Sequence, residues 1–533
     1  MVVLIPVLVL SLGAVLIQVF GRLNKRPGTS WLVASISALT AWIALIPIGI
    51  LLPGGLMIEH WIPESYPFSS IVFQFTPQSW ILGFLISSLS LAVIFSEAKN
   101  LSSTGYINRL SSSLFLSGLG ILAVSAGSEL TFLFAWALMD LVEFGVLSVI
   151  IGRQKSLPSA AASISIRFIG ILVLLILIIL GSSGDQVMRG ADLTPAMGWL
   201  LILLIAARMG ILPLFQPYAE DPIYQRGLIT IIRALPLITS FAFIFYISGS
   251  GSLPVKTGLI FFVLTVTLIY GAVSWVNASN ELKGRPYWNL SIAAMGLLVF
   301  LTDHTSALTG LAILQIATGS ALFLYSPRFK KPLPFLFLLI LGLLPFPFSP
   351  ASPITTFFTA ERLNLVTVIW LVAYVLLLCG VIKHSLRKDE SSIPIEPWMG
   401  LFHAIALFLL VLAPLLVVLI QFQTLQLRPA LWSWLTITGL VILLSLFTLR
   451  FVHLGSSIQN RFMRTKKVFT TSIHYLEVVL NLSWLGKLIS SLGFIIEKIV
   501  QLLSRVLEGE GGILWSFLFI ILFLSLIFTR QVP

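Results

Sequence analysis

Residues 164–180 read Ile-Ser-Ile-Arg-Phe-Ile-Gly-Ile-Leu-Val-Leu-Leu-Ile-Leu-Ile-Ile-Leu, an apolar run that carries a single charge at Arg167. Residues 401–420 form a second run of this kind, apolar on every face of a helix. A helix crosses a bilayer with about 20 apolar residues, whereas a membrane β-barrel needs shorter strands of alternating polarity. These runs therefore predict an all-α polytopic membrane protein.

The composition of the chain excludes several classes of protein. The 533 residues are 58% hydrophobic and only 10% charged, which is too apolar for a soluble domain. The net charge of +12 follows the predicted membrane topology, so no nucleic-acid partner is expected. The single cysteine, Cys379, and six scattered histidines provide no disulfide framework and no metal-ligand spacing. We expect no metal, no cofactor and no catalytic centre, so any redox chemistry would belong to partner subunits.

The distribution of basic residues predicts the topology. Polar residues, Pro and Gly separate sixteen candidate spans: 2–20, 31–53, 80–96, 110–126, 129–152, 163–181, 195–216, 227–248, 257–277, 287–302, 307–325, 333–349, 363–383, 399–421, 430–450 and 513–529. The loops after odd-numbered spans hold 24 of the 32 Lys and Arg residues, whereas the even loops and the C-terminus hold five. Because basic loops favour the inner face, we expect both termini outside, in a bacterial plasma membrane.

Two segments are predicted not to span the membrane. Residues 54–79 contain alternating apolar residues and indicate a short hairpin on the outer face. Residues 456–508 carry apolar residues at helical spacing and predict a long amphipathic helix. This helix either lies on the inner leaflet or runs along neighbouring membrane subunits, which residues 456–510 would then contact. Lipids are the other expected partners.

Proline positions predict an internal repeat. Pro213 in span seven, and Pro345 and Pro347 in span twelve, predict broken helices. Matched interruptions in two halves are typical of inverted-repeat transporters. We expect two inverted five-helix repeats, spans four to eight and nine to thirteen, each with its broken helix fourth. The predicted segments are 1–109 (N-terminal helices and outer hairpin), 110–250 and 251–385 (repeats), 386–455 (C-terminal helices), 456–510 (lateral helix) and 511–533 (final anchor).

Five charged side chains fall inside apolar stretches: Asp140, Glu143, Arg167, Arg208 and Arg233. Charge at membrane depth costs at least about 2.5–3.5 kcal/mol per group, so such residues tend to face partners or water and mark ion paths. Three of the five are arginines, which do not readily give up a proton. The cluster is therefore either an ion path or a static ion-pair network that holds helices together.

Several sequence motifs, in order, resemble one family of membrane subunits. Residues 129–143, Glu-Leu-Thr-Phe-Leu-Phe-Ala-Trp-Ala-Leu-Met-Asp-Leu-Val-Glu, resemble the fifth helix of the antiporter-like subunits of respiratory complex I, membrane-bound hydrogenases and Mrp-type cation/proton antiporters. Residues 207–218 and 221–230 are similar to the seventh-helix and eighth-helix motifs, residues 280–296 to the tenth-helix signature, and residues 343–347 to the broken twelfth helix. The resemblance covers about residues 60–360. The amphipathic segment makes the chain most similar to the distal, lateral-helix-bearing subunit of complex I.

The departures from the family pattern bear on mechanism. The resemblance implies a fifth-helix Glu paired with a seventh-helix Lys, through which moving charge couples proton steps. Here the Glu position is Ala137, with Asp140 one turn later, and the Lys position is Arg208. The family His in span eight is Thr230. Because buried lysine can lose its proton but arginine stays charged, a charge pair without a working proton relay is expected.

Three functions remain open from the sequence. The favoured one is an antiporter-like membrane subunit of a complex I-type (NADH or ferredoxin:quinone oxidoreductase-like) or related proton- or cation-translocating assembly, with a degenerate or absent relay. The others are a Mrp-like cation/proton or inorganic-carbon-linked secondary transporter, and a structural scaffold in which residues 456–508 clamp neighbours. Small polar residues in the spans either line a water file or serve in packing: Ser163, Ser165, Thr230, Ser291, Thr318 and Ser320.

Overall fold

The computed structural model describes residues 2–23, 27–52, 54–58, 70–101, 103, 105–151, 157–181, 194–211, 226–248, 258–325, 344, 349, 351–359, 365–386 and 396–421, with isolated positions 438, 439, 441, 442, 446, 498, 520 and 521. The chain divides into two compact units, Met1–Ile473 and His474–Pro533. All elements below belong to the first unit. The predicted lateral helix, 456–510, and the predicted breaks at Pro345 and Pro347 lie outside the described residues, apart from the single position 498.

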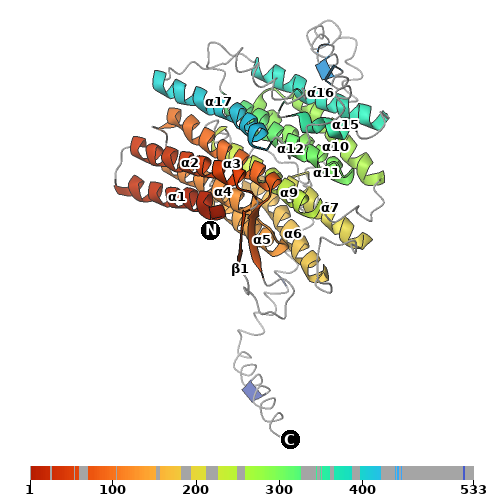
Figure 1. Ribbon diagram of the computed structural model, residues 1–533, viewed down its shortest axis with the longest axis horizontal. Helices are drawn as coiled ribbons and strands as arrows, with labels where there is room; N and C mark the ends of the chain where they lie inside the picture. Colours follow the sequence, from red (N-terminus) through yellow and green to blue (C-terminus); the bar gives the residue numbers. More distant parts are fainter. Residues whose placement is uncertain are drawn as a thin grey trace. The chain divides into compact units, whose positions relative to one another are not determined.

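Helices make up nearly all of the described structure. Their bounds are α1 Ile5–Leu23, α2 Pro27–Ile50, α3 Pro77–Ser96, α4 Tyr106–Val124, α5 Glu129–Ile151, α6 Leu157–Gly181, α7 Pro195–Met209, α9 Leu228–Ile247, α10 Gly258–Asn277, α11 Glu281–Leu301, α12 Ser306–Ile313, α13 Ala321–Leu324, α15 Thr355–Thr359, α16 Leu365–Ser385 and α17 Pro397–Ile420 (Figure 1). In this part of the chain, eleven helical segments are long and apolar enough to cross a membrane. The predicted all-α polytopic fold is confirmed. The count of sixteen stays a prediction, because spans 333–349, 430–450 and 513–529 lie almost entirely outside the described residues.

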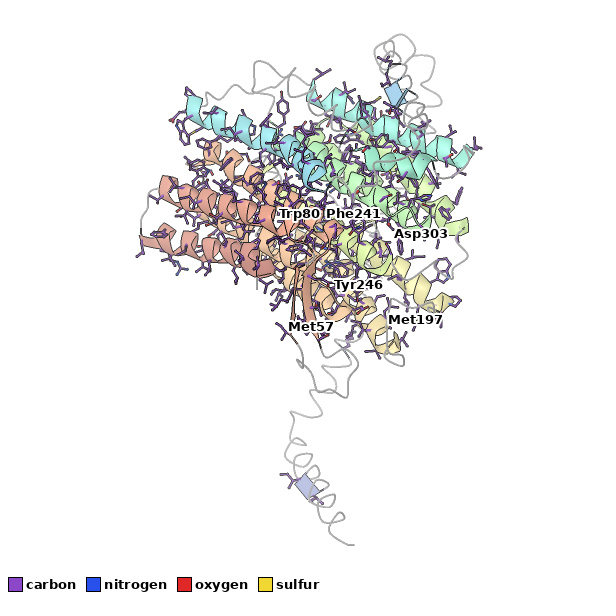
Figure 2. The ribbon with its side chains drawn as sticks, in the orientation of Figure 1. Met57, Trp80, Met197, Phe241, Tyr246 and Asp303 are labelled. Carbon is purple, nitrogen blue, oxygen red and sulfur yellow. The ribbon has the colours of Figure 1, made fainter. Side chains whose placement is uncertain are left out.

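Helices α3 and α9, together with the segment Ser306–Leu324, form the interior of the described bundle. In α3 and α9, 94% of the membrane-length window is buried, against 39% in α1 and α2, which present exposed apolar faces. Helix α3 packs against α2, α4, α9 and, from far along the sequence, α17. Figure 2 shows Trp80 of α3 and Phe241 of α9 among the packed side chains of the interior. Helix α3 carries no charged residue on any face, and such a helix belongs in a surrounded position.

Within each predicted five-helix unit, the first and the fifth helix pack together. In the first unit these helices are α4 and α9. Helices α5, α6 and α7 each pack against the next, and α7 contacts α9. In the second, the corresponding helices α10 and α16 pack together as well. The inverted relation between the units stays a prediction, since the fourth helix of the second unit, residues 333–349, is almost wholly outside the described residues.

Helix α7 ends earlier than the predicted 216. Gly210 adopts the left-handed conformation, with φ of 76°, and the Ile211 N–H donates to the Ala206 carbonyl at 3.1 Å. This closure satisfies a terminal carbonyl, and glycine adopts a positive φ without steric cost. The interruption of span seven therefore starts at Gly210, before Pro213, which lies outside the described residues.

The predicted hairpin contains two antiparallel strands, β1 (Gly54–Ile58) and β2 (Ile71–Phe75), in the register Gly54↔Phe75. Figure 2 shows Met57 on β1, where it is largely exposed. The Gln74 N–H donates to the Ser125 carbonyl at 2.7 Å, so β2 is fixed to the turn between α4 and α5. The membrane side on which the hairpin lies stays a prediction.

Span eleven is not a uniform α-helix. Between α12 and α13 the chain forms a π-helix, η4, over Leu314–Ser320. The widened turn is buried throughout. π-turns are rare and recur at functional sites, and this one carries the buried amide side chain of Gln315.

Candidate functional site

Helix α5 turns one face inward, and that face carries both predicted acids. Trp136, Asp140 and Glu143 follow at i, i+4 and i+7, and all three are at most 1% exposed. Leu138 and Leu141, on the opposite face, are 43% and 60% exposed. The helical period thus places an aromatic ring and two carboxylates in one buried column.

Arg167 of α6 binds Glu143, the second of the two acids along α5. Its Nη1 donates to Glu143 Oε2 at 2.8 Å, and its Nη2 donates to Glu143 Oε1. The same Nη1 lies 3.4 Å from Asp140 Oδ1. The Arg167 guanidinium and the Glu143 carboxylate form a bidentate pair, the geometry with which arginine recognises carboxylates most specifically.

Arg208 of α7 completes the network through an ion pair between its Nη1 and Asp140 Oδ2. The guanidinium carbon lies 4.6 Å from the centre of the Trp136 ring, a cation–π contact. Its side-chain stem crosses α6 at Gly170, where a Cβ would lie 3.3 Å from Arg208 Cδ. Asp140 is therefore held between two arginines, Arg167 and Arg208.

Arg233 of α9 adds a third buried guanidinium. It is 4% exposed. Its backbone carbonyl accepts a hydrogen bond from Asn289 Nδ2 at 3.3 Å. The structure thus brings four of the five predicted charges into direct ion pairs, and Arg233 is buried on α9, a helix that packs against α7.

Uncharged amides extend the polar region into the second five-helix unit. Gln315 Nε2 donates to Asn289 Oδ1 at 2.9 Å, and Trp288 Nε1 donates to Gln315 Oε1 at 2.8 Å. Gln315 lies in the π-helix, and Gly319, one π-turn further on, leaves room for the Trp288 ring. The sequence offered no sign of this bridge, because neither amide carries a charge and the partners are far apart along the chain.

A second cluster of ion pairs lies where the sequence suggested only basic loops. Arg109 and Glu97 are 1% and 2% exposed and form an ion pair at 3.2 Å. Arg226 pairs with Glu281, and its Nη1 also donates to the Tyr325 carbonyl. Glu97 and Glu281 are acids in loops that are otherwise basic, and this was the available signal for buried partners.

Thr230 belongs to the second cluster and not to the Asp140 network. Its Oγ1 donates to the Arg226 carbonyl at 2.6 Å and accepts from Arg285 Nη1 at 3.4 Å. Arg285 is 2% exposed and lies over the Phe323 ring, with 5.5 Å between the guanidinium carbon and the ring centre. The position that resembles the family histidine therefore serves a helix contact near the N-termini of α9 and α11.

The small polar residues predicted for a water file or for packing have mixed placements. Ser291 Oγ donates to the Tyr287 carbonyl at 3.0 Å, and Ser320 Oγ donates to the Gln315 carbonyl at 3.2 Å. Ser165 is exposed on the outer face of α6, so it cannot line an interior row of water molecules, and that prediction is wrong for this residue. Back-bonding of this kind favours the packing interpretation for Ser291 and Ser320.

The fold and the network define an integral all-α membrane protein with a buried arginine–carboxylate cluster. No family model and no curated protein matches the sequence. Solved structures do share the fold. A chain of the Mrp complex from Dietzia sp. DQ12-45-1b has a TM-score of 0.72 at 13% identity over 100% of this chain. This chain spans 63% of the length of that Mrp chain.

Two respiratory complexes contain chains with the same fold. A chain of respiratory complex I from Thermus thermophilus has a TM-score of 0.57 at 15% identity, over 77% of this chain and 97% of its own length. A chain of the membrane-bound sulfane sulfur reductase, an archaeal respiratory membrane complex, has a TM-score of 0.66 at 13% identity, over 98% and 99% respectively. The similarity is one of fold alone, so the function of this chain has to be inferred from its side chains.

Proposed function

We propose that the chain is an antiporter-like membrane subunit of a complex I-type or related proton- or cation-translocating assembly, and that its own proton relay is degenerate or absent. One observation carries the proposal: the buried acid Asp140 is paired with Arg208, where the resembled family has a lysine. Arginine keeps its proton under protein conditions, so this pair holds a fixed charge. A lysine in the same place could have released its proton on burial.

The rest of the network supports a fixed arrangement. Asp140 contacts two guanidinium groups, and Glu143 accepts hydrogen bonds from both Nη atoms of Arg167. Removing one partner from a buried pair leaves an uncompensated charge, which costs about 3–5 kcal/mol. The network therefore ties α5, α6 and α7 together. A carboxylate that is held this firmly is poorly suited to gain and lose a proton in each transport cycle.

The proposed setting is a multi-subunit complex in a bacterial plasma membrane, with both termini on the outer face. The three solved structures above are parts of complexes, two of them respiratory. Neighbouring membrane subunits would be contacted by residues 456–510, and lipids would cover the exposed apolar faces of α1 and α2. The excess of basic residues in odd-numbered loops supports the orientation.

A second candidate is a Mrp-like cation/proton transporter subunit. The Mrp chain has the higher TM-score, 0.72 against 0.57 for the complex I chain, and is matched over the whole of this chain. In that case Asp140 and Glu143 would have to exchange partners during transport, which their present pairing opposes.

The experiment that separates the two candidates is purification of the tagged full chain from native membranes, followed by identification of the co-purifying proteins. We expect other membrane subunits together with redox subunits, and loss of this association when residues 456–510 are deleted. A deletion of the hairpin residues 59–69 serves as the control, because it removes a loop on the opposite predicted face. A monodisperse chain that is stable alone and exchanges protons for cations in vesicles would contradict the proposal.

A further inference from the structure

One edge of α1 carries polar side chains beside an outward face that is otherwise apolar. The main contacts of α1 are with α2 and α4, and its third side faces outward (Figure 1). On that side Leu12, Val15 and Val19 are 44–62% exposed. At the border with α4, however, Gln18 Nε2 donates to Asn108 Oδ1 at 3.2 Å, and this hydrogen bond is exposed. Amide groups are unfavourable against hydrocarbon, so the pair indicates the depth of the lipid headgroups.

Arg22 lies on the same edge, one turn further along α1. It follows Gln18 at i+4, which places it about 6 Å closer to the end of the helix. This end of α1 presses on the start of α4, because a Cβ at Gly21 would lie 2.7 Å from Ile107 Cδ1. The Arg22 side chain is exposed, and it forms no hydrogen bond or ion pair with the described residues. The Arg22 guanidinium and the Asn108 amide therefore share one end of the α1–α4 edge.

The charge at this end of α1 is positive and favours an anionic partner. Lys25 and Arg26 follow Arg22 in the sequence, and this stretch contains no acid. Glu97, just before the loop that leads into α4, is 2% exposed and pairs with Arg109 at 3.2 Å, so its charge is already neutralised. The basic loop predicts the inner face of the membrane, where anionic lipids attract Lys and Arg side chains.

We propose that an anionic phospholipid binds at this edge, with its phosphate between the Arg22 guanidinium and the Asn108 Nδ2 amide. Asn108 Oδ1 accepts from Gln18, so Nδ2 remains the donor for a phosphate oxygen. Arginine binds phosphate through paired N–H groups. One acyl chain covers Val15 and Val19, which continue the exposed side of α1 toward the membrane centre. The site goes beyond the proposed function and does not depend on which complex contains the chain.

The test is the thermal unfolding of the delipidated full chain in mild detergent, titrated with phosphatidylglycerol, phosphatidylcholine or inorganic phosphate at constant ionic strength. We expect a saturable rise of the Tm with phosphatidylglycerol alone. Arg22→Gln should raise the half-saturating concentration of phosphatidylglycerol about tenfold, and Asn108→Ala about threefold. An equal rise with phosphatidylcholine or with inorganic phosphate, or no rise with phosphatidylglycerol, would overturn the site.

Lys283→Gln is the matched control for this titration. It removes an exposed positive charge from α11, at the same predicted membrane face. Because Lys283 lies on another helix, its replacement should leave the half-saturating concentration unchanged. Equal shifts for Arg22→Gln and Lys283→Gln would show a diffuse attraction between basic side chains and anionic lipid, and no site at the α1–α4 edge.

A second measurement on the unmodified protein covers the case in which the variants do not fold. A structure of the full chain with its native partners, in a bilayer that contains phosphatidylglycerol, should show a lipid whose phosphate lies within hydrogen-bonding distance of Arg22 and Asn108. A protein side chain packed over this edge, or an edge without an ordered lipid, would refute the proposal.

Discussion

Replacing Asp140 with Asn should destabilise the protein more than any other single change in the charge network. The substitution keeps the size of the side chain but removes the anion that faces Arg208 and lies 3.4 Å from Arg167. Arg208 is then left without an anionic partner among the described side chains, which corresponds to a loss of about 3–5 kcal/mol. Glu143→Gln is the matched control: Arg167 retains Asp140, so we expect a smaller loss of about 1.5–3 kcal/mol.

The assay is reversible unfolding of the full chain in mixed detergent, with the free energy of unfolding compared among single and double variants. Asp140→Asn combined with Arg208→Gln removes both charges, so its cost should fall below the sum of the single costs by at least about 1 kcal/mol. Strictly additive costs would show that the pair is not coupled. Equal losses for Asp140→Asn and Glu143→Gln would show that Asp140 is not the shared centre of the network.

Two glycines offer further tests, with a third as control. Gly227→Ala should cost about 1–3 kcal/mol in thermal stability, because a Cβ there would overlap the carboxylate of Glu97 and disturb its ion pair. Gly319→Ala should cost a similar amount by displacing the Trp288 indole, and the change should appear as altered tryptophan fluorescence. Gly145→Ala, exposed on a helix with no atom near the new methyl group, should be neutral or stabilising by about 0.5–1 kcal/mol. Comparable losses at all three positions would contradict the packing described.

Most of the fold could be predicted from hydropathy, whereas the helix ends could not. The span predicted at 257–277 is helix α10, Gly258–Asn277. The span predicted at 287–302 begins earlier, because α11 starts at Glu281, where the side chain of Asn280 caps its first turn. Hydropathy detects the apolar centre of a helix, but caps and buried ion pairs determine where it begins.

The site was predictable only where its residues lie in runs that are otherwise apolar. Asp140 and Arg208 stand out from their surroundings, and their positions within a familiar motif order suggested the pair that the structure contains. Asn289 and Gln315 meet through folding alone, since each is an ordinary polar residue in its own helix. The same holds for the hydrogen bond from Asn289 Nδ2 to the Arg233 carbonyl, which joins α11 to α9, so the contact between the two predicted units required coordinates.

The central claim is that this network holds charge without relaying protons, and proton translocation in vesicles tests it most directly. In the assembly proposed above, an electron donor of the co-purified redox subunits would drive turnover, and acidification would be followed with a pH-sensitive dye for the wild type and for Asp140→Asn. We predict equal translocation per assembled complex, with any loss matching the loss of assembly. A marked fall in translocation by a fully assembled Asp140→Asn complex would show that protons pass through this carboxylate and would contradict the account.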